Sequence, residues 1–292
     1  MSADPGLSTI AGDRGLLINL AYRMLGSLSD AEDVVQETYA RWYAMTPAEQ
    51  DTIEVPAARL TRVASRICLD VLGSARVRRE TYVGEWIPEP VPDRTDGDPA
   101  DRITLDESIS MAFLVVLESM TPAERVAFVL HDVFRYSYAE VAEIVGRTPA
   151  ACRKLASLAR RRIGTSHPVP ASTAAEHARV VRQFKQAWET KDIKALLGLL
   201  DPDATAVADG GGHVLARLRP IEGAERIARF YVEIARRATG LRILEQTVNG
   251  RPGLVVEHAG ATIAVLALDV AGCRIRRIWS VRNPEKLRPW TG

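Results

Sequence analysis

The chain has little cysteine and no long hydrophobic run. Its 292 residues include three cysteines, Cys68, Cys152 and Cys273, whose wide spacing contains no CxxC or Cys/His metal-binding pattern. We therefore expect three buried free thiols in a reducing compartment. The N-terminus lacks the basic and apolar regions of a signal peptide, and no stretch approaches the ~18 apolar residues needed to cross a bilayer. These absences predict a cytoplasmic protein with no membrane contact.

Net charge is also nearly absent, because 38 Lys and Arg residues against 37 Asp and Glu residues give +1 at pH 7. Taken alone, this balance would argue against nucleic-acid binding. The charge is unevenly distributed, however: the segment TPAACRKLASLARRRI at 148–163 contains five basic residues and no acid. A local cationic patch matters more for DNA binding than the total charge does.

The segment 137–163 has the pattern of a helix-turn-helix. Ala142 and Cys152 fall where the two helices touch, Gly146 falls at the turn, and Pro149 suits the first turn of the second helix. The outward face of the second helix is expected to bind DNA through Arg153, Lys154, Ser157, Arg160 and Arg161. A plain helical hairpin with a solvated basic face is the alternative.

Residues 14–82 read as a helical unit with an acidic and a basic surface. Ser29 is expected to cap a helix, with Glu32 completing a capping box. The acidic surface could dock a basic or polar partner, or could simply complement the helix dipole, and it comprises Asp30, Glu32, Asp33, Gln36 and Glu37. The cationic stripe, which could also be a solvated helix face, comprises Arg59, Arg62, Arg66, Arg76, Arg78 and Arg79.

Two segments rich in proline and polar residues divide the chain. GEWIPEPVPDRTDGDPADR at 84–102 reads as an extended acidic linker, and GTSHPVPAST at 164–173 reads as a second linker. Beyond them come helical patterns, the last of them at Ala224–Arg237, and then several strand-like segments. Turns at Asn249-Gly250 and Ala271-Gly272 separate these segments, which indicates a separate α+β domain that ends in an antiparallel meander. The sequence thus predicts a helical domain at 1–83, a second one with the helix-turn-helix at 103–163, and an α+β domain at 174–292.

Several motifs together resemble a known family. DAEDVVQETYARW, PAARLTRVASRICLDVLGSARVRRETY and the helix-turn-helix resemble regions 2 and 4 of an extracytoplasmic-function (group 4) sigma-70 factor. GEWIPEP (84–90), DGGGH (209–213) and NPEKL (283–287) are similar to the WLPEP, DGGGK and NPDKL motifs of a subgroup with a fused C-terminal SnoaL-like domain of NTF2 fold. His213 stands where that subgroup has a basic residue.

The resemblance implies a multidomain protein, with two all-α domains followed by an NTF2-like α+β cone. The acidic surface would bind the β′ subunit of the RNA polymerase core, with the β subunit as a further partner. The arginine stripe would bind the −10 promoter element, Tyr82 could stack on a base, and helix 149–162 would read the −35 element. The segment 84–102 would thread toward the active-site channel of the polymerase, or would serve only as a solubilising linker.

The resemblance also implies regulation by the C-terminal domain. The contacts expected to carry it are Trp86, Pro88, Asp209, Gly210, Gly211, Gly212, His213, Asn283, Pro284, Glu285, Lys286 and Leu287. A glycine-rich turn required only by the backbone is a simpler interpretation of 209–212. Because NTF2-like cones often hold a small molecule, a pocket could be lined by Asp209, His213, His258, Trp188, Tyr231 and Trp279.

These features predict an alternative sigma factor that directs promoter-specific transcription initiation as a monomer. We expect no enzymatic activity, no cofactor and no metal, while a small ligand of the C-terminal domain stays open. The alternative is a helix-turn-helix transcription regulator whose C-terminal domain senses a small molecule or is a vestigial cyclase.

Overall fold

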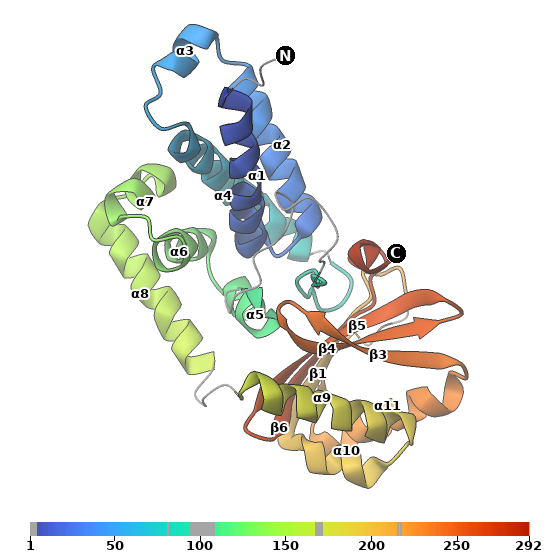
Figure 1. The fold of residues 1–292 in the computed structure, drawn as a ribbon. Coiled ribbons are helices and arrows are strands. Elements are labelled where there is room, and N and C mark those ends of the chain that lie inside the picture. The colour runs from blue at the N-terminus through green and yellow to red at the C-terminus, as the bar shows by residue number, and fades with distance from the viewer. Residues whose placement is uncertain are drawn as a thin grey trace. The chain divides into compact units, whose positions relative to one another are not determined.

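A computed structural model describes residues 5–80, 82–93, 109–166, 172–214, 216 and 218–291, with side chains omitted at 5–13, 75–80 and 165–166. The described chain forms two compact units (Figure 1). The first unit contains residues 5–80 and 113–166. The second contains 82–93, 109–112 and 172–291.

The first half of the first unit is a helical bundle. Helices α1 (Pro5–Leu25), α2 (Leu28–Tyr43) and α4 (Pro56–Glu80) pack against one another, and α3 (Pro47–Asp51) follows α2 (Figure 1). The prediction that Ser29 caps α2 was wrong. Ser27 is the cap, because Gly26 ends α1 with φ 68° and the Ser27 hydroxyl then accepts a 3.2 Å hydrogen bond from the backbone N–H of Asp30.

The second half of this unit contains the part of α5 (Met111–Glu118) that begins at Phe113, and then α6 (Pro122–Phe128), a π-helical turn (Val129–Val133), α7 (Tyr138–Val145) and α8 (Pro149–Ser166). Helices α6 and α7 each begin with a capping box, which fixes where they start. Arg125 is buried and joins the two halves, since it donates to the Glu118 carboxylate at 2.7 Å and to the Met24 carbonyl at 2.9 Å. Burial lowers the pKa of Arg125 to about 9, so the guanidinium remains charged at neutral pH.

The second unit is an α+β domain, as predicted. Its helices are α9 (Ala174–Glu189), α10 (Ile193–Leu199) and α11 (Ala224–Arg237). Its sheet has the order β2-β1-β6-β5-β4-β3. The strands are β1 (Leu200–Asp209), β2 (Ile221–Glu222), β3 (Leu241–Val248), β4 (Arg251–His258), β5 (Ala261–Ala271) and β6 (Arg274–Val281).

Strands β3 to β6 form the expected antiparallel meander, whereas β1 pairs with β6 in parallel. This parallel pair and the short strand β2 were not predicted. Figure 1 shows the helices of this unit along the sheet. The apolar face of α11, with Ile227, Ala228 and Tyr231, belongs to the core that the sheet and α9 complete.

The cysteines are free, and Cys68 and Cys152 are buried as expected. The expectation was wrong for Cys273, which is exposed because it lies in the tight turn between β5 and β6, beside Gly272 with φ 59°. In the described part of the chain, no helix is both long and apolar enough to span a bilayer.

Candidate nucleic-acid surfaces and the linker clamp

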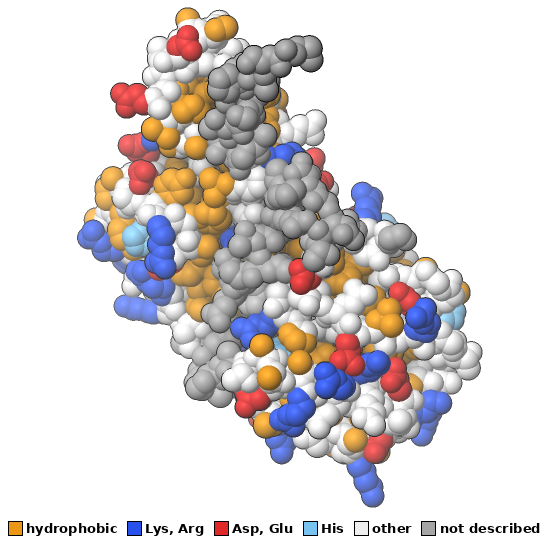
Figure 2. Space-filling model, viewed as in Figure 1, with side chains coloured by type: hydrophobic (Ala, Val, Ile, Leu, Met, Phe, Trp, Pro, Cys, Tyr) orange, Lys and Arg blue, Asp and Glu red, His pale blue; other side chains and the backbone are white. Residues whose placement is uncertain are grey.

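Helices α7 and α8 form the helix-turn-helix. Gly146 ends α7 in a left-handed conformation (φ 68°, ψ 37°), and its N–H bonds the Ala142 carbonyl. Cys152, Ala156 and Ala159 form the buried side of α8. Figure 2 shows Lys and Arg side chains gathered over the α7–α8 part of the first unit.

The predicted DNA-binding residues of α8 do not all face solvent equally. Arg153, Lys154 and Arg161 are exposed, whereas Ser157 is half-buried. Arg160 forms a 2.8 Å ion pair with Asp132, so part of its charge is neutralised within the unit. Its side chain is still 45% exposed, which leaves it able to approach a phosphate.

The acidic surface lies on α2. Glu32, Asp33, Gln36 and Glu37 are exposed, and Asp30 is half-buried in the first turn of the helix. Val34, Val35 and Thr38 are buried on the opposite side. Glu37 also pairs with Arg41 at 2.8 Å on the exposed face. The arrangement presents a row of carboxylates to solvent and anchors the helix through its apolar side.

The cationic stripe lies on α4, and part of it contacts α7. Arg62 forms a 2.6 Å ion pair with the Glu143 carboxylate, and Arg66 donates to the Glu143 backbone carbonyl at 2.8 Å. Arg59 is exposed. The side chains of Arg76, Arg78 and Arg79 lie outside the described residues. Two predicted −10-binding arginines are therefore engaged by the first helix of the helix-turn-helix.

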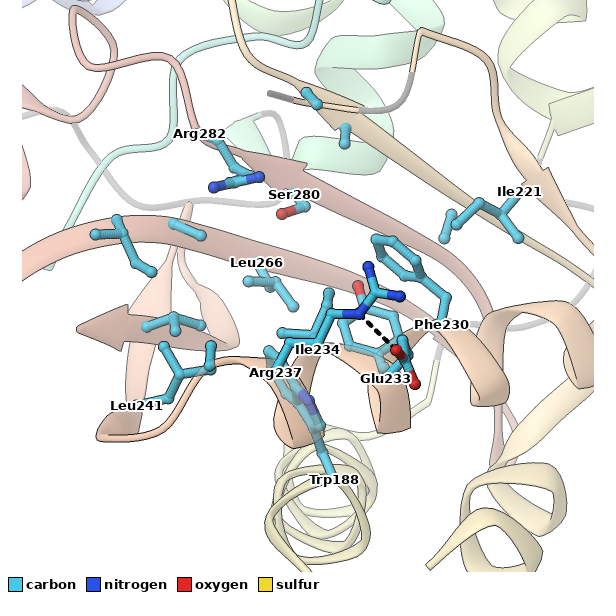
Figure 3. A pocket seen from close by; sticks show the side chains of 18 of the residues that line it. Trp188, Ile221, Phe230, Glu233, Ile234, Arg237, Leu241, Leu266, Ser280 and Arg282 are labelled. Atoms are coloured by element: carbon cyan, nitrogen blue, oxygen red, sulfur yellow. Dashed lines mark hydrogen bonds and ion pairs between the residues drawn. The ribbon is translucent and has the colours of Figure 1, made fainter. Parts of the chain in front are cut away.

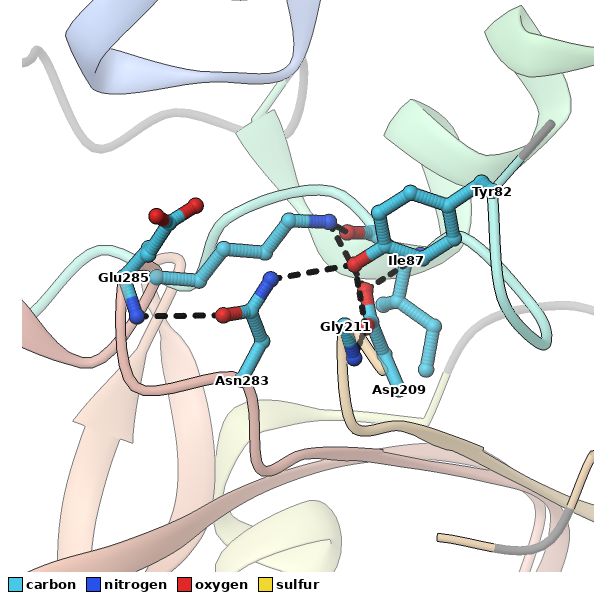
Figure 4. A network of polar contacts seen from close by, with 7 residues as sticks. Tyr82, Ile87, Asp209, Gly211, Asn283 and Glu285 are labelled. Atoms are coloured by element: carbon cyan, nitrogen blue, oxygen red, sulfur yellow. Dashed lines mark hydrogen bonds and ion pairs between the residues drawn. The ribbon is translucent and has the colours of Figure 1, made fainter. Parts of the chain in front are cut away.

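In the second unit, the carboxylate of Asp209 holds the segment 82–87 (Figure 4). Asp209 ends β1 and is 0% exposed. Its Oδ1 accepts a hydrogen bond from the Tyr82 hydroxyl at 2.6 Å, and its Oδ2 accepts one from the Ile87 backbone N–H at 3.0 Å. Burial, with the Asp209 hydrogen bond, raises the pKa of Tyr82, so the hydroxyl remains a protonated donor.

Lys286 completes this group of contacts. Its Nζ donates to Asp209 Oδ2 at 2.7 Å and to the Ile87 carbonyl at 2.5 Å, and it lies 4.1 Å from the Trp86 ring centroid. Asn283 adds a 3.0 Å hydrogen bond from Nδ2 to the Tyr82 hydroxyl. We call Tyr82, Ile87, Asp209, Asn283 and Lys286 the linker clamp.

The glycines of the 209–212 turn serve both the backbone and the clamp. Gly211 has φ 64°, and a Cβ there would collide with the Asn283 side chain. Its N–H donates to Asp209 Oδ1 at 3.0 Å. Gly212 has φ 77°, and a Cβ there would come within 3.2 Å of Val83. The turn therefore needs glycine for its conformation and for close approach to the segment it holds.

A second anchor follows the clamp along the chain. The buried side chain of Asn249 accepts a 3.1 Å hydrogen bond from the Val91 N–H and donates to the Ile109 carbonyl at 2.9 Å. The indole N–H of Trp290 donates to the Pro90 carbonyl at 2.9 Å. These residues were missed from the sequence, where Asn249-Gly250 indicated only a hairpin turn.

The structure brings together most of the predicted regulatory residues. Pro88 and Leu287 are buried near the clamp contacts, whereas Pro284 and Glu285 are exposed. His213 is exposed as well, and the cation beside Asp209 is Lys286 instead. Tyr82, which the sequence suggested could stack on a base, donates a hydrogen bond to Asp209. Of the predicted pocket residues, Trp188 and Tyr231 line a large cavity (Figure 3), whereas Asp209, His213, His258 and Trp279 do not.

A helical unit that contains a helix-turn-helix, followed by an α+β unit, is the architecture of a DNA-binding protein with an added domain. Residues 10–79 match the family model "Sigma-70 region 2", and residues 110–163 match "Sigma-70, region 4". The chain is 37% identical over 283 residues to "ECF RNA polymerase sigma factor SigJ" of Mycobacterium tuberculosis H37Rv, covering 92% of this chain and 89% of the relative.

A second relative, "Probable ECF RNA polymerase sigma factor SigI" of Mycobacterium tuberculosis CDC 1551, is 34% identical over 294 residues, covering 98% of this chain and 96% of that protein. The crystal structure of Mycobacterium tuberculosis SigJ matches with a TM-score of 0.78 and 33% identity, covering 97% and 98% of the two chains.

The chain belongs to the ECF family of RNA polymerase sigma factors and carries a fused C-terminal SnoaL-like domain of NTF2-like fold. As a member it is an alternative sigma factor for promoter-specific initiation, which binds RNA polymerase core and promoter DNA. Sigma factors are in general not enzymes.

Proposed function

We propose that the second unit regulates this sigma factor by capturing the linker that follows α4. The single observation that supports the proposal is the linker clamp: a fully buried carboxylate, Asp209, accepts hydrogen bonds from the side chain of Tyr82 and the backbone of Ile87. A segment held by a buried, charge-assisted network is not free to extend elsewhere. Capture and engagement with polymerase would therefore exclude each other.

The other surfaces have distinct roles in this proposal. The acidic face of α2 docks on the β′ subunit of polymerase, α4 binds the −10 element, and α8 reads the −35 element. The contacts of Glu143 with Arg62 and Arg66 support a free state in which part of the −10 surface is covered. Freeing both the linker and α4 would then accompany assembly with the polymerase.

Hydrogen exchange tests the capture. The backbone N–H groups of Ile87 and Val91 donate to buried side chains, so they should exchange slowly in the free protein. In the complex of the full chain with polymerase core, the same peptide should exchange faster, because the clamp has opened. Unchanged protection of 82–93 in the complex would overturn the proposal, and the peptide of β5, whose backbone pairs with β4 and β6 inside the sheet, provides an internal comparison.

The docking face is tested by neutralising two exposed carboxylates. We expect the Glu32→Gln/Asp33→Asn variant to bind polymerase core about tenfold more weakly, since charges at an interface centre are costly to lose. The control variant, Asp51→Asn/Glu54→Gln, removes two exposed acids outside α2 and should bind as the parent does. Equal affinities in a fluorescence-anisotropy titration would remove the assignment of α2 as the docking face.

A further inference from the structure

Tyr138, the first residue of α7, contacts two of the arginines on α8 that are predicted to bind DNA. The guanidinium of Arg153 lies over the tyrosine ring, with its Cζ 5.3 Å from the ring centroid. Arg160 donates a 3.3 Å hydrogen bond from Nη2 to the tyrosine hydroxyl. Because residues seven apart lie on the same face of a helix, one side chain of α7 contacts two successive turns of that face.

The position of the Tyr138 ring is itself fixed by its neighbours. A capping box formed by Ser137 and Glu140 sets the first turn of α7. The ring of His131, from the π-helical turn, stacks on the tyrosine ring with the centroids 3.8 Å apart and an angle of 23° between the planes. His131 is held in turn, because its Nδ1 donates to the Tyr136 carbonyl at 2.8 Å. Tyr138 is thus half-buried and held in place within the first unit.

The two arginines are held in different ways. Arg160 also forms a 2.8 Å ion pair with Asp132, so its guanidinium has a second anchor. Arg153 is exposed, and its contact is with the Tyr138 ring. A long arginine side chain loses much rotamer entropy when it is ordered, so ordering it in advance lowers the cost of binding. A cation–π contact uses the charge of the guanidinium and leaves its N–H donors available.

We propose that Tyr138 determines promoter specificity by positioning Arg153 against a guanine of the −35 element. The inference rests on the proposed reading of that element by α8. Guanine presents two acceptors in the major groove that a guanidinium can bind in a bidentate manner. Such a contact needs both N–H groups at defined angles, so an ordered arginine discriminates between bases better than a mobile one. Tyr138 acts through Arg153 and is a positioning residue.

The measurement is the preference of the holoenzyme between two DNA sequences. A −35 element selected from a randomised library is compared with a scrambled one, and the preference is the ratio of the two dissociation constants. Tyr138→Leu should lower this ratio about fivefold, as expected for a lost cation–π contact, and should leave binding to the scrambled element within about twofold. Tyr138→Phe retains the ring and should keep the preference of the parent. An unchanged ratio in Tyr138→Leu, or an equal loss in Tyr138→Phe, would overturn the inference.

A double-mutant cycle separates positioning from a general effect on folding. In an Arg153→Ala background, Tyr138→Leu should lower the preference no further, because the side chain that it positions is gone. Equal losses in the two backgrounds would show a structural role and contradict the inference. If Arg153→Ala alone leaves the preference unchanged, the base-reading assignment fails and this inference fails with it. If Arg153→Ala lowers the preference and Tyr138→Leu does not, only the inference fails.

The parent protein provides a test that needs no variant. In the full chain with isotopically labelled arginine, the Nε–H group of Arg153 should have a nuclear magnetic resonance order parameter above about 0.6, the value below which a group is flexible. A flexible Arg153 in the free parent would overturn the inference, even if circular dichroism shows that Tyr138→Leu does not fold. In a folded Tyr138→Leu variant, the same order parameter should fall below about 0.6.

Discussion

At the scale of single residues, the second unit depends on a buried ion pair. Asp209 is 0% exposed, and the side chain of Lys286 is 10% exposed. Taking two charges out of water is costly, and the cost is recovered only when hydrogen bonds satisfy the remaining polar groups. Tyr82 and Ile87 supply two of those bonds from the linker. The hydrogen bonds from Tyr82 and Ile87 therefore offset part of the free-energy cost of burying the Asp209–Lys286 ion pair.

His177 gives the same unit a defined response to acid. It is 2% exposed, and its pKa is lowered to about 4, chiefly by burial and then by the charge of Arg251, against the opposing effects of a Pro252 backbone hydrogen bond and Asp269. The folded state thus keeps the imidazole neutral while the unfolded chain binds a proton below its ordinary pKa of 6.5. Stability contributed by the neutral ring is present above pH 6.5 and is lost as pH falls toward 4.

We therefore expect unfolding of the second unit to become easier by up to about 3 kcal/mol between pH 6.5 and pH 4 through this residue. Thermal melts of the full chain and of His177→Leu across that range measure the difference. The variant should lose this component of the pH dependence. Parallel pH profiles for the two proteins would show that His177 does not titrate as described.

At the scale of elements, α8 makes contacts within the first unit and still presents exposed cations to solvent. Arg160 pairs with Asp132, whereas Arg153 lies over the Tyr138 ring at 5.3 Å and remains exposed. Arginine can bind guanine in a bidentate manner, and phosphate contacts carry no sequence information. Arg153 is thus the better candidate for reading a base, and Arg161 for gripping phosphate.

Replacing Arg153 with alanine should cost about 1–3 kcal/mol in binding a −35 element selected from a randomised promoter library. The loss should be confined to the selected sequence. Arg161→Ala should instead weaken binding to all sequences alike and reduce the salt dependence. Titrations of holoenzyme against the selected and scrambled elements distinguish the two, and a uniform loss for Arg153→Ala would make it a phosphate contact.

Locally encoded elements could be predicted from the sequence. Gly146 and Pro149 mark the turn of the helix-turn-helix, and Ala224–Arg237 has the predicted bounds of α11 because its apolar period is strong. The parallel pairing of β1 with β6 was not predictable in this way, since it joins residues about seventy positions apart and leaves no local pattern. The cap of α2 was misplaced by two residues because two serines compete there.

The candidate site was predictable only in part. Motif resemblance indicated Asp209, Asn283 and Lys286, but nothing in the pattern indicated that Tyr82 would be their partner. Asn249 was hidden for another reason: its φ of 51° suits a turn, and the same residue also hydrogen-bonds Val91 of the linker and Ile109, which lies beyond the linker in the sequence. A side chain that hydrogen-bonds a group far away in the sequence leaves no periodic pattern by which its role could be predicted.

At the scale of the whole molecule, the central claim is that capture of the linker opposes assembly with polymerase. A protein whose competent state is only partly populated binds with an affinity reduced by that fraction. Weakening the clamp should therefore increase apparent affinity without changing the promoter that is chosen. Strengthening the clamp should have the opposite effect.

The most direct measurement is promoter-specific transcription in vitro, with polymerase core and increasing amounts of the full-length protein. The Asp209→Asn/Lys286→Met variant opens the clamp without leaving an unpaired buried cation, and Asp203→Asn is its control on an exposed position of β1. We predict that the clamp variant reaches half-maximal transcription at a several-fold lower concentration, with the control unchanged. A half-maximal concentration equal to or above that of the parent would contradict the account.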